Sequence, residues 1–222
     1  MDLLQEQLGQ LPVVKEPRKK VTQDTSALII VDMLNGFCNI GPLQSPYNDK
    51  LKEPIANLVS QFNGPILSVQ DAHYETDDEF EAFPPHCMAG TEEAQLVEPI
   101  NQEMNKNPKA EVLEKQTLSP FFGAQGFEEW LKKQLESGIE NFYIVGNCTD
   151  LCVYHTATGL NMWLAEQENK ADVKVILEMV STYDMPKEDT PEGALPHPRD
   201  IFHQVFLHHM ALNNVKLVEI SD

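Results

Sequence analysis

Short apolar runs alternate with amphipathic stretches along most of the chain. ALIIVDM (27–33) and NFYIVGN (141–147) are apolar on both faces, which is typical of strands buried inside a parallel sheet. Similar runs predict further strands at 65–71, 110–116, 172–178 and 215–220. Apolar residues at helical spacing predict helices at 48–62, 126–138, 149–167 and 198–214, with Thr149 or Asp150 as the N-cap of the third. The alternation predicts an α/β fold, a Rossmann-like three-layer α/β/α sandwich with a mostly parallel sheet of about six strands.

Two segments differ from this pattern. Residues 1–25 are polar, with the basic sequence KEPRKK at 15–20, and predict an N-terminal arm followed by one domain over residues 26–222. The polar segment STYDMPKEDTPEGALPHPRD, residues 181–200, lies near the carboxyl ends of the predicted strands. It is a candidate lid over that edge, a candidate contact within a homo-oligomer, or a segment that reshapes a pocket there.

The charge of the chain excludes two classes of partner. Its 222 residues include 35 Asp and Glu against 16 Lys and Arg, a formal net charge of -19 at pH 7. Such a surface repels phosphate backbones and anionic lipids, so neither a nucleic acid nor a membrane is expected as a partner. No apolar run approaches the roughly 20 residues that span a bilayer, and the N-terminal residues lack the pattern of a signal peptide. The four cysteines are therefore expected to be reduced thiols of a cytoplasmic protein.

Chemically reactive side chains follow several of the predicted strands. Asp32 ends the first strand, Asp71 and His73 follow the second, Lys115 ends the third, and the fourth runs into residues 146–152. Ligands of parallel α/β sheets bind beyond the carboxyl ends of the strands. The sequence therefore predicts that an acid, a lysine, a thiol and a metal-ligand pair meet at one edge of the sheet.

The stretch VGNCTDLCV contains two cysteines one helical turn apart, Cys148 and Cys152. They are candidates for a metal clip, a disulfide, or a nucleophile with its neighbour. Cys152 is predicted in the first turn of a helix, where the helix dipole favours a thiolate, and Lys115 nearby would lower the thiol pKa further. Asp32 would take the thiol proton and return it to a leaving group. Taken singly, each residue is better explained structurally, as a buried thiol, a surface lysine or a capping acid. Their joint position at adjacent strand ends reverses this preference and favours catalysis.

A second set of residues has the composition of a metal site. Asp71 and His73 occupy alternate positions, so on an extended backbone their side chains point the same way, as two ligands of one ion do. His86, in FPPHC, is a third candidate, and Glu79 or Glu81 would add an oxygen ligand. The alternative is a solvated acidic loop with incidental histidines, and the spacing leaves both interpretations open. Four further histidines resemble a metal cluster only by number, and a helix surface with scattered histidines is the better interpretation for His197, His203, His208 and His209.

Five motifs, in this order, resemble those of the isochorismatase-like cysteine hydrolases, and within them the nicotinamidases: IIVDMLNGF, QDAH, FPPHCMAGTE, VLEKQTLSPF and VGNCTDLCV. The resemblance covers residues 26–220. It implies a catalytic triad of Asp32, Lys115 and Cys152, with Cys152 as the nucleophile. It also implies a cis peptide bond between Asn147 and Cys148, and an oxyanion hole formed by the backbone N–H groups of Cys148 and Cys152.

The resemblance further implies a divalent metal ion: zinc, iron or manganese. Its expected ligands are Asp71, His73, His86 and, as the fourth, Glu79. Substrate contacts are expected from Phe37 and Phe83, which would flank a ring, and from Asn147. The implied activity is hydrolysis of nicotinamide to nicotinate and ammonia through a thioester. The alternatives are another small amide, ureido or imine substrate of the same triad, and a non-catalytic metal- or ligand-binding protein on the same scaffold.

Overall fold

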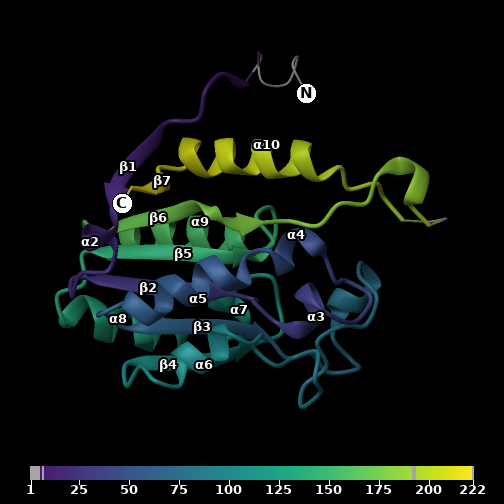
Figure 1. Ribbon diagram of the computed structural model, residues 1–222, viewed down its shortest axis with the longest axis horizontal. Coiled ribbons are helices and arrows are strands. Elements are labelled where there is room, and N and C mark those ends of the chain that lie inside the picture. Colours follow the sequence, from purple (N-terminus) through teal and green to yellow (C-terminus); the bar gives the residue numbers. More distant parts are fainter. Residues whose placement is uncertain (1–5, 7, 192–193, 222) are drawn as a thin grey trace.

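The central layer of the molecule is a single parallel sheet (Figure 1). The structure, a computed structural model, describes residue 6 and residues 8–191 and 194–221. The strands are β1 (Val13–Pro17), β2 (Ser26–Val31), β3 (Ile66–Asp71), β4 (Ala110–Lys115), β5 (Asn141–Asn147), β6 (Asp172–Ser181) and β7 (Lys216–Ser221). Their order is β1-β7-β6-β5-β2-β3-β4, and each adjacent pair is parallel. The predicted α/β/α fold is confirmed, with seven strands rather than about six.

Helices cover both faces of the sheet because its central strands alternate their apolar side chains between two cores. Ile29 and Val31 of β2 pack on the side of α8 (Phe127–Glu136), α9 (Cys152–Glu166) and α10 (Arg199–Leu212). Leu28 and Ile30 pack on the side of α5 (Lys52–Gln61) and α6 (Ile100–Met104). This period of two explains why the strands are continuous apolar runs in the sequence. The remaining short elements are α2 (Arg18–Val21), α3 (Asn35–Cys38), α4 (Pro46–Asp49), η1 (Asp78–Glu81), α7 (Pro120–Gly123) and η2 (Lys187–Asp189). Among the described residues, no helix is both long enough and apolar enough to cross a membrane.

Two predicted helices differ from the observed ones in their bounds. The helix predicted over 48–62 is divided in two, because α4 ends at Asp49 and α5 begins at Lys52. The helix predicted from Thr149 begins at Cys152, and its N-cap is Leu151, which makes no side-chain capping bond. The prediction that Thr149 or Asp150 caps this helix is therefore wrong. Both side chains are hydrogen-bonded to histidines instead.

The strand that the sequence did not predict, β1, comes from the segment predicted as an N-terminal arm. Val13–Pro17 pairs in parallel with β7 at the edge of the sheet. The Glu16 carboxylate is buried below this edge, where it accepts a hydrogen bond of 2.8 Å from Lys174 of β6 and contacts the Tyr143 hydroxyl of β5. Residues 13–21 thus belong to the same folded unit as the rest of the sheet.

The carboxyl ends of β2, β3, β4 and β5 form the edge at which the reactive residues were predicted. Asp71 lies opposite Lys115 in the β3–β4 register, and Val31 lies opposite Gly146 in the β2–β5 register. A Cβ atom at Gly146, where φ is +117°, would meet the Val31 carbonyl oxygen at 2.0 Å. Only glycine therefore allows β5 to approach β2 closely just before the chain enters residues 147–152.

Candidate active site

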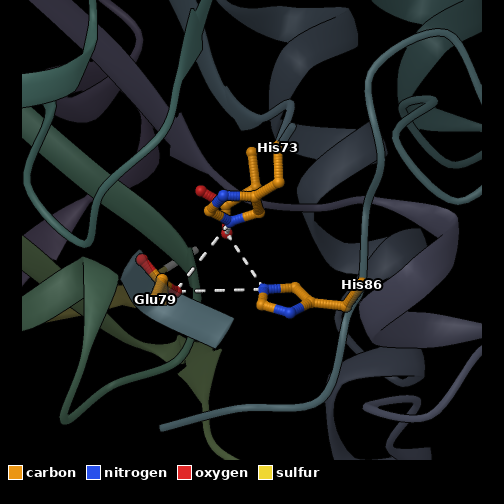
Figure 2. Close-up of side chains that lie close together, drawn as sticks. His73, Glu79 and His86 are labelled. Atoms are coloured by element: carbon orange, nitrogen blue, oxygen red, sulfur yellow. Dashed lines mark ion pairs between the residues drawn. The ribbon is translucent and has the colours of Figure 1, made fainter. Parts of the chain in front are cut away.

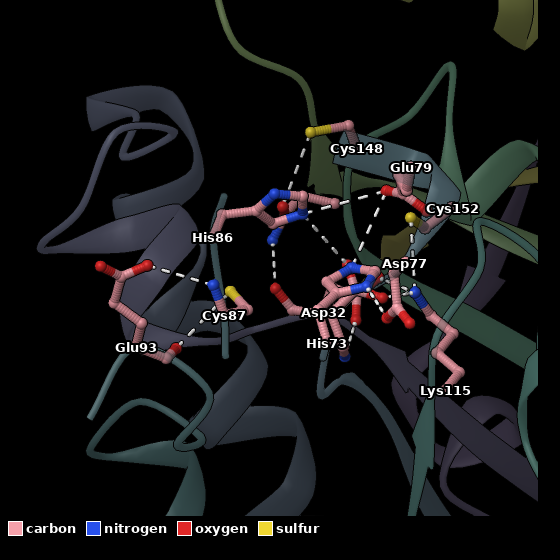
Figure 3. A network of polar contacts seen from close by, with 12 residues as sticks. Asp32, His73, Asp77, Glu79, His86, Cys87, Glu93, Lys115, Cys148 and Cys152 are labelled. Atoms are coloured by element: carbon pink, nitrogen blue, oxygen red, sulfur yellow. Dashed lines mark hydrogen bonds and ion pairs between the residues drawn. The ribbon is translucent and has the colours of Figure 1, made fainter. Parts of the chain in front are cut away.

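The three predicted catalytic residues meet around one buried ammonium group. The Lys115 Nζ atom lies 2.8 Å from Asp32 Oδ2 and 3.6 Å from Cys152 Sγ, and it also forms an ion pair with Asp71 (Figure 3). All four side chains are buried. Asp32 directly follows β2, Asp71 and Lys115 end β3 and β4, and Cys152 begins α9, as the strand-end argument predicts.

Asp32 is held by the ends of two neighbouring strands. Its backbone is left-handed, with φ +49°, a conformation that aspartate tolerates better than most residues. Its Oδ1 atom accepts a hydrogen bond of 2.9 Å from the Asp71 backbone N–H. Its backbone carbonyl accepts one of 2.7 Å from the Asn147 side-chain amide. The carboxylate is thus turned toward Lys115 while Oδ2 remains available for proton exchange.

The electrostatics of this group contradict the prediction that the pKa of the Cys152 thiol is lowered. Burial, together with the charges of Asp32 and Asp71, raises the pKa of the Cys152 thiol well above its ordinary value, although Lys115 opposes the shift. Burial and the Asp71 charge raise the pKa of Asp32 to about 6. Two carboxylates share one ammonium here, so a thiolate would add a second uncompensated negative charge. Before substrate binds, Cys152 is therefore a neutral thiol, and the neighbouring Asp32 carboxylate can accept its proton.

A second cluster lies beside the first and shares Asp71 with it. Ligand atoms of Asp71, His73, Glu79 and His86 all lie within 4.8 Å of one another. The nitrogen-to-oxygen separations run from 3.7 Å, between His73 Nε2 and Asp71 Oδ2, to 3.9 Å for the pairs that involve Glu79 or His86 (Figure 2). Donors bound to one tetrahedral ion are about 3.4 Å apart, so a small contraction of this cluster would surround a metal. Of the two glutamates considered from the sequence, Glu79 belongs to this cluster and Glu81 does not.

The orientation of the two imidazole rings fits a metal site. His73 Nδ1 is hydrogen-bonded to Asp77 at 3.0 Å, and His86 Nδ1 to the Pro84 carbonyl at 2.9 Å. Because both partners are acceptors, each Nδ1 carries a proton, and each Nε2 faces the centre of the cluster, where it can bind a metal once it holds no proton. His73 Nε2 and Asp71 Oδ2 are buried there without a hydrogen-bond partner. Buried polar atoms in this condition are costly, and a shared cation would satisfy them.

The pKa values of this cluster point in the same direction. Burial opposes a charge on His73, but Asp71 and Asp77 outweigh it and raise the pKa of His73 to about 9. Burial and the Asp71 charge raise the pKa of Glu79 to about 7. The cluster thus carries more negative charge than its surroundings balance, and it retains protons in place of a cation.

A small cavity connects the two clusters. Phe37, Phe83 and Asn147, the predicted substrate contacts, line it, and the ring centroids of Phe37 and Phe83 lie 5.4 and 6.3 Å from that of His86. The predicted site residues in its wall are Asp32, Asp71, Glu79, His86, Cys148 and Cys152. His73 and Lys115 lie behind this wall. The other residues of the wall are three leucines that the sequence analysis did not predict: Leu43, Leu118 and Leu151.

The turn from β5 to α9 passes beside the Cys152 thiol. The Asn147–Cys148 peptide bond is cis, as the resemblance implies. The Cys148 carbonyl accepts hydrogen bonds from the N–H groups of Leu151 and Val153, each at 3.1 Å. Within the described part of the chain, the N–H groups of Cys148 and Cys152 have no hydrogen-bond acceptor. These are the two donors expected to form the oxyanion hole.

Two residues that support the site were not predicted. Asp77 orients His73, but in an acidic loop nothing distinguishes it from Asp78 beside it. Asn48 of α4 donates to the Asn147 Oδ1 atom and to the Phe37 carbonyl, each at 3.3 Å. Its amide thus ties the turn after β5 to α3, and only the folded chain brings these segments together.

The interpretation of the remaining histidines as scattered helix-surface residues is wrong for His197, which precedes α10 and is buried against Asp150. His203 lies on α10, half-buried, and is hydrogen-bonded to Thr149. His209 does lie on the exposed side of α10.

The sequence model of the Isochorismatase domain matches residues 26–162. The chain belongs to the isochorismatase family. A relative within this family, nicotinamidase 1 of Arabidopsis thaliana, is 32% identical over 90% of this chain and 88% of its own length. The nicotinamidase/pyrazinamidase of Mycobacterium tuberculosis is 27% identical over 59% of this chain and 76% of its own.

Solved structures share the isochorismatase-family fold seen here. The nicotinamidase PncA of Bacillus subtilis superposes with a TM-score of 0.70, at 23% identity, over 88% of this chain and 99% of its own. The pyrazinamidase of Pyrococcus horikoshii, solved in complex with zinc, superposes with a TM-score of 0.66, also at 23% identity, over 88% of this chain and 99% of its own.

Proposed function

We propose that this protein is a nicotinamidase, a cysteine hydrolase that converts nicotinamide and water to nicotinate and ammonia. The observation that carries the proposal is one small cavity between the Asp32–Lys115–Cys152 group and four converging metal-ligand atoms, with residues of both clusters in its wall. The relatives that carry the name nicotinamidase support the choice of substrate.

In the first half of the reaction, Cys152 is the nucleophile. Asp32 takes the thiol proton as Sγ attacks the carboxamide carbon, and Lys115 at 3.6 Å stabilises the charge that develops on sulfur. The negative charge that forms on the carbonyl oxygen is held by the N–H groups of Cys148 and Cys152. One such donor typically contributes about 3–4 kcal/mol to the transition state.

In the second half, the proton carried by Asp32 passes to the amide nitrogen, and the C–N bond breaks to release ammonia and leave a thioester. Water then attacks the thioester carbon while Asp32 accepts a proton from it. The same two N–H groups hold the second oxyanion. When this intermediate collapses, the C–S bond breaks, nicotinic acid is released, and Asp32 returns the proton to Cys152 Sγ. The acid then loses its own proton to ammonia or solvent as nicotinate, so Asp32 and Cys152 end the cycle as they began it.

A divalent ion would be held by Asp71, His73, Glu79 and His86, and when bound it would supply a Lewis-acid contact for the ring nitrogen of the substrate. This mixed set of carboxylate and imidazole ligands suits zinc, iron and manganese. Phe37 and Phe83 would flank the ring, and the three leucines of the wall would exclude water from it. The small size of the cavity restricts the substrate to a small, single-ring amide.

The test is ammonia release from nicotinamide by the purified protein, as isolated and after incubation with zinc, iron(II) or manganese. Cys152→Ala is the catalytic variant, and Cys38→Ala, which changes a buried thiol of the core, is its control. We expect release by the wild type and by Cys38→Ala, and none by Cys152→Ala. Steady-state release by Cys152→Ala would contradict the nucleophile assignment. Absence of release by the metal-treated wild type would contradict nicotinamide as the substrate.

A further inference from the structure

The segment 181–200 is attached to the turn that contains the proposed oxyanion donors. Within it, Met185 and His197 form an antiparallel bridge. The Met185 N–H donates to the His197 carbonyl at 2.9 Å, and the His197 N–H donates to the Met185 carbonyl at 2.7 Å. The His197 Nε2 atom then lies 2.7 Å from Asp150 Oδ2, in the middle of the turn from Cys148 to Cys152. This contact joins two segments 47 residues apart in the sequence.

The His197 ring is held in one orientation. It is stacked between Tyr183, at a centroid distance of 3.9 Å, and Phe202, at 4.4 Å, with interplanar angles of 14° and 17°. Its Nδ1 atom lies 3.0 Å from the Tyr183 carbonyl. The side chain is only 6% exposed. A ring fixed in this way can hold its hydrogen-bond partner in a defined position.

Both partners of His197 are hydrogen-bond acceptors, a carbonyl and a carboxylate. The hydrogen bond to the Asp150 carboxylate is donated by the Nε2–H group of the ring. The Asp150 side chain is buried, and its other oxygen, Oδ1, has no hydrogen-bond partner. Within the described residues, His197 is therefore the side chain that hydrogen-bonds to Asp150 and positions it.

The turn has few other side-chain restraints. No side chain caps α9 at Leu151. The Thr149 N–H donates to the Ser181 carbonyl at 2.8 Å, and the Thr149 hydroxyl contacts His203 of α10 at 2.9 Å. The polar side chains that would ordinarily cap the helix are thus used to attach the turn to the segment around α10.

We propose that His197 is a positioning residue for the proposed reaction: through Asp150 it fixes the turn whose Cys148 and Cys152 N–H groups hold the oxyanion. This role rests on the proposed cysteine-hydrolase function. The role also gives the segment 181–200 a function. Its Met185–His197 bridge couples the position of α10 to the active site.

The test compares variants of His197 and Asp150 with a control on the same helix pair. His197→Phe keeps the ring stack and removes both hydrogen bonds, whereas the amide of His197→Gln can still donate to Asp150. His209→Phe removes a contact of 2.8 Å to Tyr154 on the exposed side of α9 and serves as the control. Thermal unfolding of each variant verifies that it is folded.

Four readouts separate positioning from a general loss of structure. We expect His197→Phe to lower kcat about 10- to 100-fold, less than complete loss of one oxyanion donor, with KM changed less than about threefold. The inhibition constant of pyridine-3-carbaldehyde, whose adduct with the thiol forms an oxyanion, should weaken by the same factor as kcat/KM. Alkylation of Cys152 by iodoacetamide, which forms no oxyanion, should change less than about twofold. His197→Gln should recover part of kcat, and His209→Phe should match the wild type.

A double-variant comparison tests the path through Asp150. If both residues act through one bond, His197→Phe/Asp150→Asn is no worse than the worse single variant, and additive losses would contradict the proposal. A folded His197→Phe protein with wild-type kcat would also overturn it, as would a loss of kcat without a matching loss of aldehyde affinity.

One measurement is independent of the substrate. Amide hydrogen exchange of Thr149, whose N–H is bonded to Ser181, should accelerate at least about tenfold in His197→Phe and remain unchanged in His209→Phe. Failure of the wild type to hydrolyse nicotinamide would refute the proposed substrate alone. Unchanged exchange at Thr149 would refute the positioning role alone.

Discussion

Two buried lysines at opposite ends of the sheet show how the same side chain serves structure at one place and chemistry at another. Lys115 ends β4 at the carboxyl edge and is 0% exposed, and Lys174 lies near the amino end of β6 and is 1% exposed. Lys174 donates to the Glu16 carboxylate and to the Tyr143 hydroxyl. Lys115 lies among two carboxylates and a thiol.

The two ends differ in charge balance. Burial lowers the pKa of Lys174, and the carboxylates of Glu16 and Asp172 do not fully offset this. At Lys115 burial also opposes the charge, but Asp32 and Asp71 outweigh it and raise the pKa well above the ordinary value. Around Lys174 the described partners are satisfied, whereas Asp71 Oδ2 beside Lys115 is not. A buried lysine with matched partners stabilises a fold, and one with an excess of acid beside a cavity indicates a reactive site.

The largest expected effect is on activity, and it should be confined to one of the two lysines. Lys115→Met removes the cation beside Cys152 and leaves Asp32 and Asp71 facing each other, so Asp32 retains its proton and no longer acts as a base. We expect kcat for nicotinamide hydrolysis to fall about 1,000-fold or more. Lys174→Met, at the other end of the sheet, is the matched control and should keep kcat per folded molecule within about threefold. Equal losses of kcat in the two variants would show that Lys115 has no specific role in catalysis.

The unpartnered atoms near Lys115 predict a second effect, on metal affinity. Asp77→Asn keeps the shape of the loop but removes the charge that orients His73, and loss of such a partner typically weakens metal binding about 10- to 100-fold. Asp78→Asn, its exposed neighbour, should have no effect. Competition with a chromophoric chelator measures affinity without reference to activity. Equal zinc affinity of Asp77→Asn and the wild type would contradict the assigned role of Asp77.

Stability should be affected at Lys174. Lys174→Met leaves Glu16 buried without its main partner, a loss that costs roughly 3–5 kcal/mol for a fully isolated charge. Here Lys20, at 2.7 Å from Glu16, remains and reduces the expected cost to about 2 kcal/mol in the free energy of unfolding. Denaturant unfolding measures it, and Glu16→Gln/Lys174→Met should recover part of the loss. A double variant as unstable as Lys174→Met would show that lost packing, and not the unpaired charge, is responsible.

The two lysines also show which parts of the molecule the sequence can predict. Lys115 was predictable because the strand-end rule applies to each strand separately, and the register then brings Asp71 opposite Lys115. Lys174 was not, because its partner Glu16 is 158 residues away and lies in a basic segment that reads as an arm. The neutral thiol of Cys152 was missed for a related reason, since the second carboxylate that outweighs Lys115 was assigned to the metal site alone. Contacts such as Asp150–His197 depend on where α10 packs, which no local pattern encodes.

The smallest expected effect is a pH dependence of stability that arises at the Lys174 end. Lys174, Lys20 and Tyr143 outweigh the effect of burial and lower the pKa of Glu16 from 4.5 to about 2. Because the folded pKa lies below the unfolded one, this stabilisation is fully present above pH 4.5 and is lost as the pH falls from 4.5 toward 2. Solvent screens this edge of the sheet, so we expect no more than about 1 kcal/mol. The difference in unfolding free energy between the wild type and Glu16→Gln, measured from pH 7 to pH 3, should shrink by that amount below pH 4.5. A difference that stays constant over this range would mean that Glu16 holds β1 by its packing and neutral hydrogen bonds. Neither Lys174 nor Lys20 would then stabilise the fold through an ion pair with Glu16.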